Sequence, residues 1–184
     1  MKKIYFLILC ASIFTLVACG KNLTNASQDK NLSYDEVVEY CSSNYDASAK
    51  NKYSSAKLTT TTTYTYLSGV FLAAGIKLNE PTVVEENISN SQFVFLDSSF
   101  LSSLKSLGEA TFALIDGKMN VSYSINQEQG GMSITGKATC VFNKEGLLEN
   151  NSGNSEIKMN TEYNGVSVSG TAKCDAIMTY EYII

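Results

Sequence analysis

Three residue types are absent from the sequence: it contains no histidine, no arginine and no tryptophan, and its 184 residues include one proline, Pro81. A histidine-dependent triad, a histidine-ligated metal site and an arginine finger are therefore excluded. The net charge is -4, and all the basic residues are lysine. We expect no nucleic-acid partner, because such a partner requires a positively charged stripe. Hydrophobic residues make up 44% of the chain, which is too large a share for a disordered protein.

The first twenty residues carry an export pattern. Lys2 and Lys3 precede an almost wholly apolar run from Ile4 to Leu16. This run has the length of the apolar region of a signal peptide and is too short to cross a bilayer comfortably. The sequence that follows, Leu16-Val17-Ala18-Cys19, resembles the lipobox of bacterial lipoproteins. Two alternatives are an ordinary cleaved signal, in which Cys19 has no special role, and an uncleaved signal anchor.

The resemblance to bacterial lipoproteins implies a lipid on Cys19. The thiol would receive a diacylglycerol, residues 1–18 would be removed as a lipoprotein signal peptide, and the new amine would be acylated. Two or three acyl chains give stable attachment to a membrane, whereas one chain is marginal. The lipid on Cys19 would thus hold the protein in the cell envelope. Gly20 after the cysteine resembles the pattern that sends lipoproteins to the outer membrane if the host is Gram-negative.

The rest of the chain is predicted to form one domain. Residues 19–32 are interpreted as the lipidated cysteine and a flexible polar tether, and residues 33–184 as a single α+β domain. Ser33 and Glu36 have the spacing of a capping box, and apolar residues then recur at helical intervals, which predicts a helix over residues 34–49. The pattern fits a strand or a helix over residues 58–75, with the helix slightly favoured.

The stretch between residues 77 and 108 is predicted to be mixed. Residues 77–91 are interpreted as an exposed connection, and residues 93–96 as a short strand. Asp97 or Ser98 is expected to cap a short helix that contains Phe100 and Leu104 and ends at Gly108.

Two hairpins are predicted from residue 109 onward. Asp116-Gly117 is a two-residue turn of the primed type, which places Leu114 opposite Met119, and Phe112 opposite Val121. Asn164-Gly165 is a second turn of this kind. It places Ile157 opposite Ala172, and Glu156 opposite Lys173. Both registers separate apolar from polar residues cleanly, which supports them.

The two hairpin regions also resemble each other. Residues 118–140 and 158–174 share the order Lys-Met-Asn, Tyr and Gly-x-Ala-x-Cys, which predicts an internal repeat. The alternative is a chance similarity between strands rich in Ser, Thr and Val.

Three cysteines, Cys41, Cys140 and Cys174, remain beyond the signal region once Cys19 carries lipid. The equivalent places of Cys140 and Cys174 in the repeat suggest a possible disulfide, although two strands that flank a common neighbour are too far apart for one. Pairing of Cys41 with either of them and three unpaired thiols are the alternatives. A catalytic cysteine is not expected, because no histidine is present to activate it.

The predicted fold class is α+β, with N-terminal helices packed on one face of an antiparallel β-meander of five or six strands. We expect no enzyme activity, cofactor or metal, and a surface or envelope interaction role with an unknown protein. The first alternative is a carrier or sensor of an apolar ligand held between helices and sheet, lined by Phe112, Val121, Tyr123, Ile134 and Val168. A carboxylate-dependent hydrolase is the last alternative.

Overall fold

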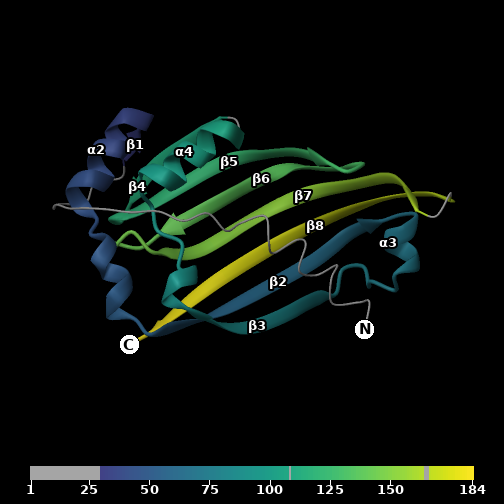
Figure 1. Cartoon of the computed structure of the whole chain (residues 1–184), viewed down its shortest axis with the longest axis horizontal. Helices are drawn as coiled ribbons and strands as arrows, with labels where there is room; N and C mark the ends of the chain where they lie inside the picture. Colours follow the sequence, from purple (N-terminus) through teal and green to yellow (C-terminus); the bar gives the residue numbers. More distant parts are fainter. Residues whose placement is uncertain (1–29, 108, 164–165) are drawn as a thin grey trace.

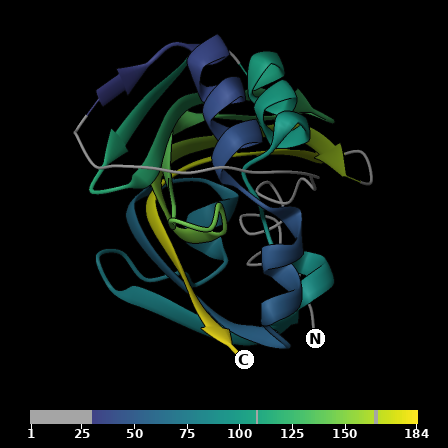
Figure 2. The ribbon, with the colours of Figure 1, turned by 90° about the vertical axis from the view of Figure 1, so that its left-hand side faces the viewer.

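The computed structural model describes residues 30–107, 109–163 and 166–184. The lipobox, Cys19, the turn at residues 164–165 and most of the predicted tether lie outside the described residues. The described chain is mainly an antiparallel sheet of eight strands in the order β1-β4-β5-β6-β7-β8-β2-β3. In Figure 1 strands β4 to β8 lie side by side in chain order, and Figure 2 shows that the sheet is strongly curved.

The elements have the following bounds. The strands are β1 Lys30–Leu32, β2 Ser55–Leu67, β3 Pro81–Ser89, β4 Ala110–Ile115, β5 Lys118–Gln129, β6 Met132–Phe142, β7 Leu148–Tyr163 and β8 Val166–Ile183. The helices are α2 Tyr34–Asn44, α3 Val70–Ala73 and α4 Ser98–Leu107, with 3-10 turns η2 Ala47–Lys52 and η3 Asn90–Gln92. None of the helices among these described residues has the length and apolar character needed to cross a membrane.

Both predicted hairpin registers are confirmed. Phe112 lies opposite Val121 in the β4–β5 pair, and Ile157 lies opposite Ala172 in the β7–β8 pair. The β4–β5 turn has positive φ angles at Asp116 (51°) and Gly117 (74°), as a primed two-residue turn requires. The two hairpin regions predicted to be repeats belong to β5–β6 and β7–β8, and their common origin stays a prediction.

The predicted capping residues lie where the sequence placed them. The Ser33 side chain accepts a hydrogen bond from the Glu36 backbone N–H, and the Glu36 carboxylate accepts one from the Ser33 backbone N–H at 2.8 Å. Helix α2 ends at Asn44, earlier than predicted, and the chain continues as the 3-10 turn η2. Asp97 caps α4 by accepting hydrogen bonds from the Ser99 and Phe100 N–H groups.

The helix favoured over residues 58–75 is wrong. Residues 55–67 form β2, and only residues 70–73 form the short helix α3. The threonine run has a high strand propensity, and β2 lies between β8 and β3, so its backbone groups find partners on both sides. The apolar residues of this stretch recur at helical intervals by coincidence. Both faces of β2 are partly buried, so apolar residues occur on both of them and not only at alternate positions.

Two further expectations change. Residues 77–91 contain strand β3 rather than only a connection, and residues 30–32 of the predicted tether form β1. The sheet therefore has more strands than the five or six expected. The segment 93–96 makes one isolated bridge, between Phe95 and Leu147, in place of a full strand.

Aromatic contacts link the helices to the strands. The Tyr34 ring of α2 meets the Phe112 ring of β4 edge-on, with centroids 6.1 Å apart, and Phe100 of α4 meets Phe142 of β6 at 5.1 Å. Met119, Val121 and Phe142 are fully buried beside these contacts. These ring contacts place α2 near β4 and α4 near β6, in the upper left part of Figure 1.

Candidate ligand-binding site

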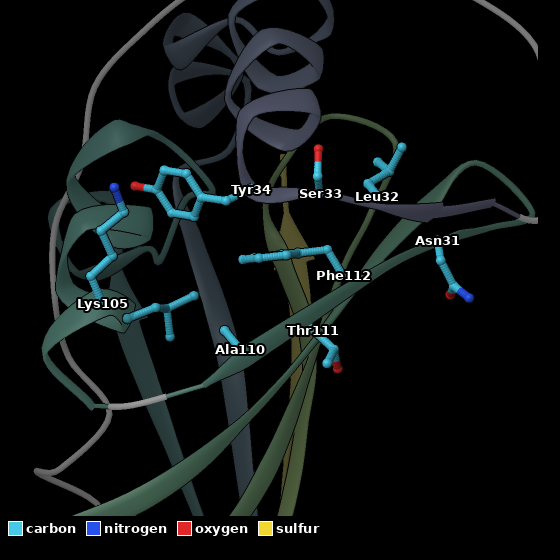
Figure 3. Close-up of a pocket in the computed structure, with 9 residues that line it drawn as sticks. Asn31, Leu32, Ser33, Tyr34, Lys105, Ala110, Thr111 and Phe112 are labelled. Atoms are coloured by element: carbon cyan, nitrogen blue, oxygen red, sulfur yellow. The ribbon is translucent and has the colours of Figure 1, made fainter.

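A surface hollow of about 430 Å³ lies where α2 and α4 meet the β1 edge of the sheet. It is lined by Asn31, Leu32, Ser33, Tyr34, Leu104, Lys105, Ala110, Thr111 and Phe112. Figure 3 shows the Phe112 ring pointing toward Tyr34 and Lys105, whereas the side chains of Asn31 and Thr111 point away from them. The hollow has the size of a small-molecule site, and we refer to it as the α4–β4 hollow.

The hollow has an apolar floor and a polar rim. Leu104 is 2% exposed and Phe112 is 5% exposed, so both are part of the core as well as of the floor. Asn31, Thr111 and Lys105 are exposed at the rim. Three separate segments supply these residues: β1 with the start of α2, the end of α4, and β4. The strand pairing of Leu32 with Phe112 joins the first of these segments to the last.

Lys105 is the one charged side chain that lines the described hollow. Its Nζ atom lies 3.9 Å from the centroid of the Tyr34 ring, which is a cation–π contact. The nearby Glu36 carboxylate is engaged elsewhere, because it accepts a hydrogen bond from Lys30 Nζ at 2.7 Å and two from Ser33. The bond from Lys30 and those from Ser33 lower the pKa of Glu36 to about 2. Lys105 forms no ion pair with a described carboxylate.

The five residues predicted to line one ligand cavity do not share one in the described structure. Phe112 lines the α4–β4 hollow, and Ile134 lines a different, much smaller cavity. Val121 is fully buried, and Tyr123 is 8% exposed beside Cys140. Val168 is half-buried on β8, opposite Thr161, and lines neither cavity.

The smaller cavity, of about 30 Å³, is lined mainly by apolar groups of β5 to β8, including Ile125, Ile134 and Met178. Asn151 also lines it, is 3% exposed, and has an Oδ1 atom with no hydrogen-bond partner.

A third cavity, of about 180 Å³, lies between α2 and the start of α4 and includes Cys41 and Asp97. Asp97 is 4% exposed; its Oδ1 atom accepts the two capping hydrogen bonds, whereas Oδ2 has no hydrogen-bond partner. Burial raises the pKa of the Asp97 carboxyl above its usual value of 3.8. It is the only carboxylate among the described residues that line this cavity.

No disulfide joins Cys140 and Cys174. Cys140 lies on β6 opposite Asn151 of β7, and Cys174 lies on β8 opposite Ser155, so β7 separates the two thiols. Strands on either side of a common neighbour are about 9.5 Å apart, which exceeds disulfide range. Burial raises the pKa of both Cys41 and Cys140 to about 12, so neither is an activated nucleophile.

Within residues 30–107, 109–163 and 166–184, no group of three or more Cys, Asp or Glu side chains is arranged to hold a metal ion. Comparison of the chain with protein-family models, with curated proteins and with solved structures finds no match.

Of the residues that line the hollow, the sequence pointed only to Phe112 as part of a ligand site. Lys105 and Tyr34 are far apart in the chain, and nothing in the sequence pairs them. Leu104 carried a helical signal that fitted core packing equally well. The strand β1 was the decisive missing element, because it brings Asn31 and Leu32 beside β4.

Proposed function

We propose that this chain is a membrane-anchored bacterial lipoprotein of the cell envelope, with a non-catalytic interaction role and with the lipid on Cys19 as its membrane contact. The lipobox-like sequence Leu16-Val17-Ala18-Cys19 supports the anchor. The exposed edge strand β3 is the observation that supports the interaction role. In this proposal the helices α2 and α4 lie on one face of the sheet, and the ring contacts Tyr34–Phe112 and Phe100–Phe142 support that arrangement.

Strand β3 has the properties of a surface that accepts another strand. It spans Pro81–Ser89, pairs with β2 on one side only, and ends the sheet. All its residues except Ile88 are exposed, and Val83 and Val84 are 56% and 41% exposed on opposite faces. The outer backbone N–H and C=O groups of such an edge are available to an extended segment of a partner.

The charge of the edge indicates the partner. Glu85 and Glu86 lie at its centre, and Glu85 is paired with Lys57 of β2 at 2.8 Å, whereas Glu86 has no described ion pair. We therefore propose a partner protein that offers an extended segment with alternating Lys or Arg side chains. A second copy of this chain is disfavoured, because full-length antiparallel pairing of two β3 strands places Glu85 opposite Glu85.

The edge is tested with two proline variants. In an antiparallel pair, neighbouring residues direct their N–H groups to opposite sides, so one of Val83 and Val84 donates toward β2 and the other toward the open edge. We expect one of V83P and V84P to lower the melting temperature and the other to leave it nearly unchanged. A nine-residue peptide of alternating Lys and Thr, measured by fluorescence anisotropy, should bind the wild-type chain and lose binding in the thermally unchanged variant.

Two results would contradict the edge proposal. The first is equal binding of the same peptide with Glu in place of Lys, since charge would then have no part in recognition. The second is peptide binding that survives in both proline variants. Amide hydrogen exchange supplies an independent readout, because strand addition should slow exchange in β3 and leave β4 unchanged.

The lipid anchor is tested by Cys19→Ser. Mass spectrometry of the wild-type protein from membranes should show a chain that begins at Cys19 with added acyl mass. The variant should lack that mass and leave the membrane fraction or retain its signal. Recovery of unmodified Cys19 within a membrane-bound wild-type chain would overturn the lipoprotein proposal.

The two alternatives are less well supported. An apolar carrier calls for one cavity shared by the predicted residues, but Phe112 and Ile134 line separate ones. A glycoside-hydrolase-like site requires two carboxylates across a cleft, and Asp97 has no second carboxylate among the described residues that line its cavity.

A further inference from the structure

We propose that the α4–β4 hollow binds a small organic anion that has an apolar body, with Lys105 as the anion-binding residue. This inference is independent of the β3 edge, which lies at the opposite end of the sheet order. The class of ligand follows from the shape, the floor and the charge of the hollow.

The floor selects the body of the ligand. Leu104, Ala110 and Phe112 line the floor with apolar groups, and the Phe112 ring points toward Tyr34 and packs edge-on against it (Figure 3). A volume of about 430 Å³ suits a small molecule and not a macromolecule. Because Phe112 and Leu104 are almost fully buried, the floor is held by the core and is formed before a ligand arrives.

The rim selects the charge. Lys105 is exposed, and its ammonium group is held at 3.9 Å from the centroid of the Tyr34 ring. The ring leaves the other donors of this ammonium group without a carboxylate partner, since Glu36 is bound to Lys30 and Ser33. A cationic ligand would be repelled by Lys105, and a neutral ligand would gain no charge-assisted hydrogen bond from it.

The three acidic residues that adjoin the hollow do not remove this preference. Asp35 and Glu36 lie in the first turn of α2, and Glu109 precedes β4, but none of them lines the hollow. Asp35 and Glu36 lie at the N-terminal end of α2, where the helix dipole stabilises their negative charge. Asn31 and Thr111 lie on the other face of the strands from Phe112, so Lys105 is the polar group that would contact the anion.

Two kinds of ligand would offer a negatively charged group to Lys105: a dissolved carboxylic acid and an anionic lipid headgroup. We assign the hollow to a dissolved acid. The apolar part of such an acid can enter the hollow and cover its floor, whereas the acyl chains of an anionic lipid remain in the bilayer. Competition from anionic lipid tests this choice directly.

The test uses hexanoate, 1-hexanol and hexylammonium as probes, which share a chain and differ in charge. The full chain is titrated by calorimetry and by saturation-transfer NMR, in phosphatidylcholine nanodiscs if it is purified from membranes, with empty nanodiscs as the blank. We expect hexanoate to bind at least about fivefold more tightly than hexanol, because a charge-assisted hydrogen bond is stronger than a neutral one. Hexylammonium should not bind measurably.

The variant Lys105→Met should reduce hexanoate affinity to that of hexanol, because it keeps the apolar stem and removes the charge. Lys50→Met is the matched control: Lys50 Nζ also lies over an aromatic ring, at 5.3 Å from the Phe95 centroid, but it does not line the hollow. Thermal melting of both variants checks that they fold.

Four outcomes would overturn the proposal: equal affinity for hexanoate and hexanol, an unchanged affinity in K105M, an equal loss in K50M, or no binding of any probe. Replacing a third of the phosphatidylcholine by phosphatidylglycerol should leave hexanoate affinity unchanged. A fall in affinity there would overturn the assignment to a dissolved acid, since the lipid would then compete for Lys105.

Discussion

The hairpin β4–β5 and the pair β2–β3 lie in the same antiparallel sheet but are specified in different ways. A two-residue turn at Asp116-Gly117 joins β4 to β5, and alternating apolar residues fix its register. Residues 68–80, which include α3, join β2 to β3, and β3 has almost no buried side chain. The comparison shows that a local turn with a clean pattern defines a strand pair in the sequence. A strand pair that is joined by a longer connection and lacks an alternating pattern cannot be recognised from the sequence in this way.

The largest expected effect is the loss of stability when a buried side chain of the β4–β5 pair is truncated. Met119 of β5 is fully buried, so Met119→Ala should lower the free energy of unfolding by about 2–5 kcal/mol through lost burial and a residual cavity. Urea denaturation measures this change. A loss below about 1 kcal/mol would mean that the β4–β5 side is packed no more tightly than the β2–β3 side.

The turn of β4–β5 is the next test. Gly117 has φ of 74°, in the left-handed region, so Gly117→Ala should cost about 1–2 kcal/mol of unfolding free energy. Asp116, at φ of 51°, is the residue type that tolerates this conformation best after glycine and asparagine. If Gly117→Ala proves neutral in thermal denaturation, then strand pairing and not the turn sets the register.

A third test concerns two acids near the helix ends on the β4–β5 side. The pKa of Asp97 is raised by burial, so its contribution to stability is present below pH 3.8 and is lost as pH rises through its folded pKa. The pKa of Glu36 is lowered to about 2, so its contribution is present above pH 4.5 and is lost as pH falls toward 2.

The two acids should therefore have opposite signs in urea denaturation measured from pH 2 to pH 7. The stability of the wild type relative to D97N should fall with rising pH, and its stability relative to E36Q should rise. Asparagine also caps helices, so D97N tests the charge more than the cap. Slopes of the same sign would show that burial does not control Asp97.

The smallest effect is expected on β3. Val83→Thr changes a side chain that is 56% exposed, so the free energy of unfolding should stay within about 0.5 kcal/mol. Threonine keeps the branched shape that favours strands. A larger loss would mean that β3 is covered in solution. The two strand pairs would then differ less in burial than the structure indicates.

The sequence predicted the parts of the fold that depend on neighbours along the chain. The capping box of Ser33 and Glu36, the cap at Asp97 and both hairpin registers are of this kind. Strand β2 was misassigned because its apolar residues also recur at helical spacing, although its threonines favour a strand, and the pairing with β8 that decides between them is not visible in the sequence. Strand β3 was missed because its exposed residues carry no alternating pattern.

The candidate site was predicted less well than the fold, for a related reason. Phe112 was expected to line a ligand cavity and does line the hollow, because the turn at residues 116–117 fixed which way its strand faces. The contact between Lys105 and Tyr34 joins two helices that are separated by β2 and β3 in the chain. Only the assembled sheet brings these two helices together.

The pairing of β2 with β8 has a consequence for the order of folding. Ser55 pairs with Ile183 and Leu67 with Ala172, so β2 is synthesised early but gains one of its two neighbours from the last strand of the chain. Contacts between residues so far apart slow folding, because closing the long loop between them costs conformational entropy before any stabilising contact forms. During synthesis the hairpin β4–β5 has all its residues available long before β2 can pair with β8. The chain should therefore assemble from β4–β5 outward, and removal of β8 should leave β2 and β3 detached from the remaining strands.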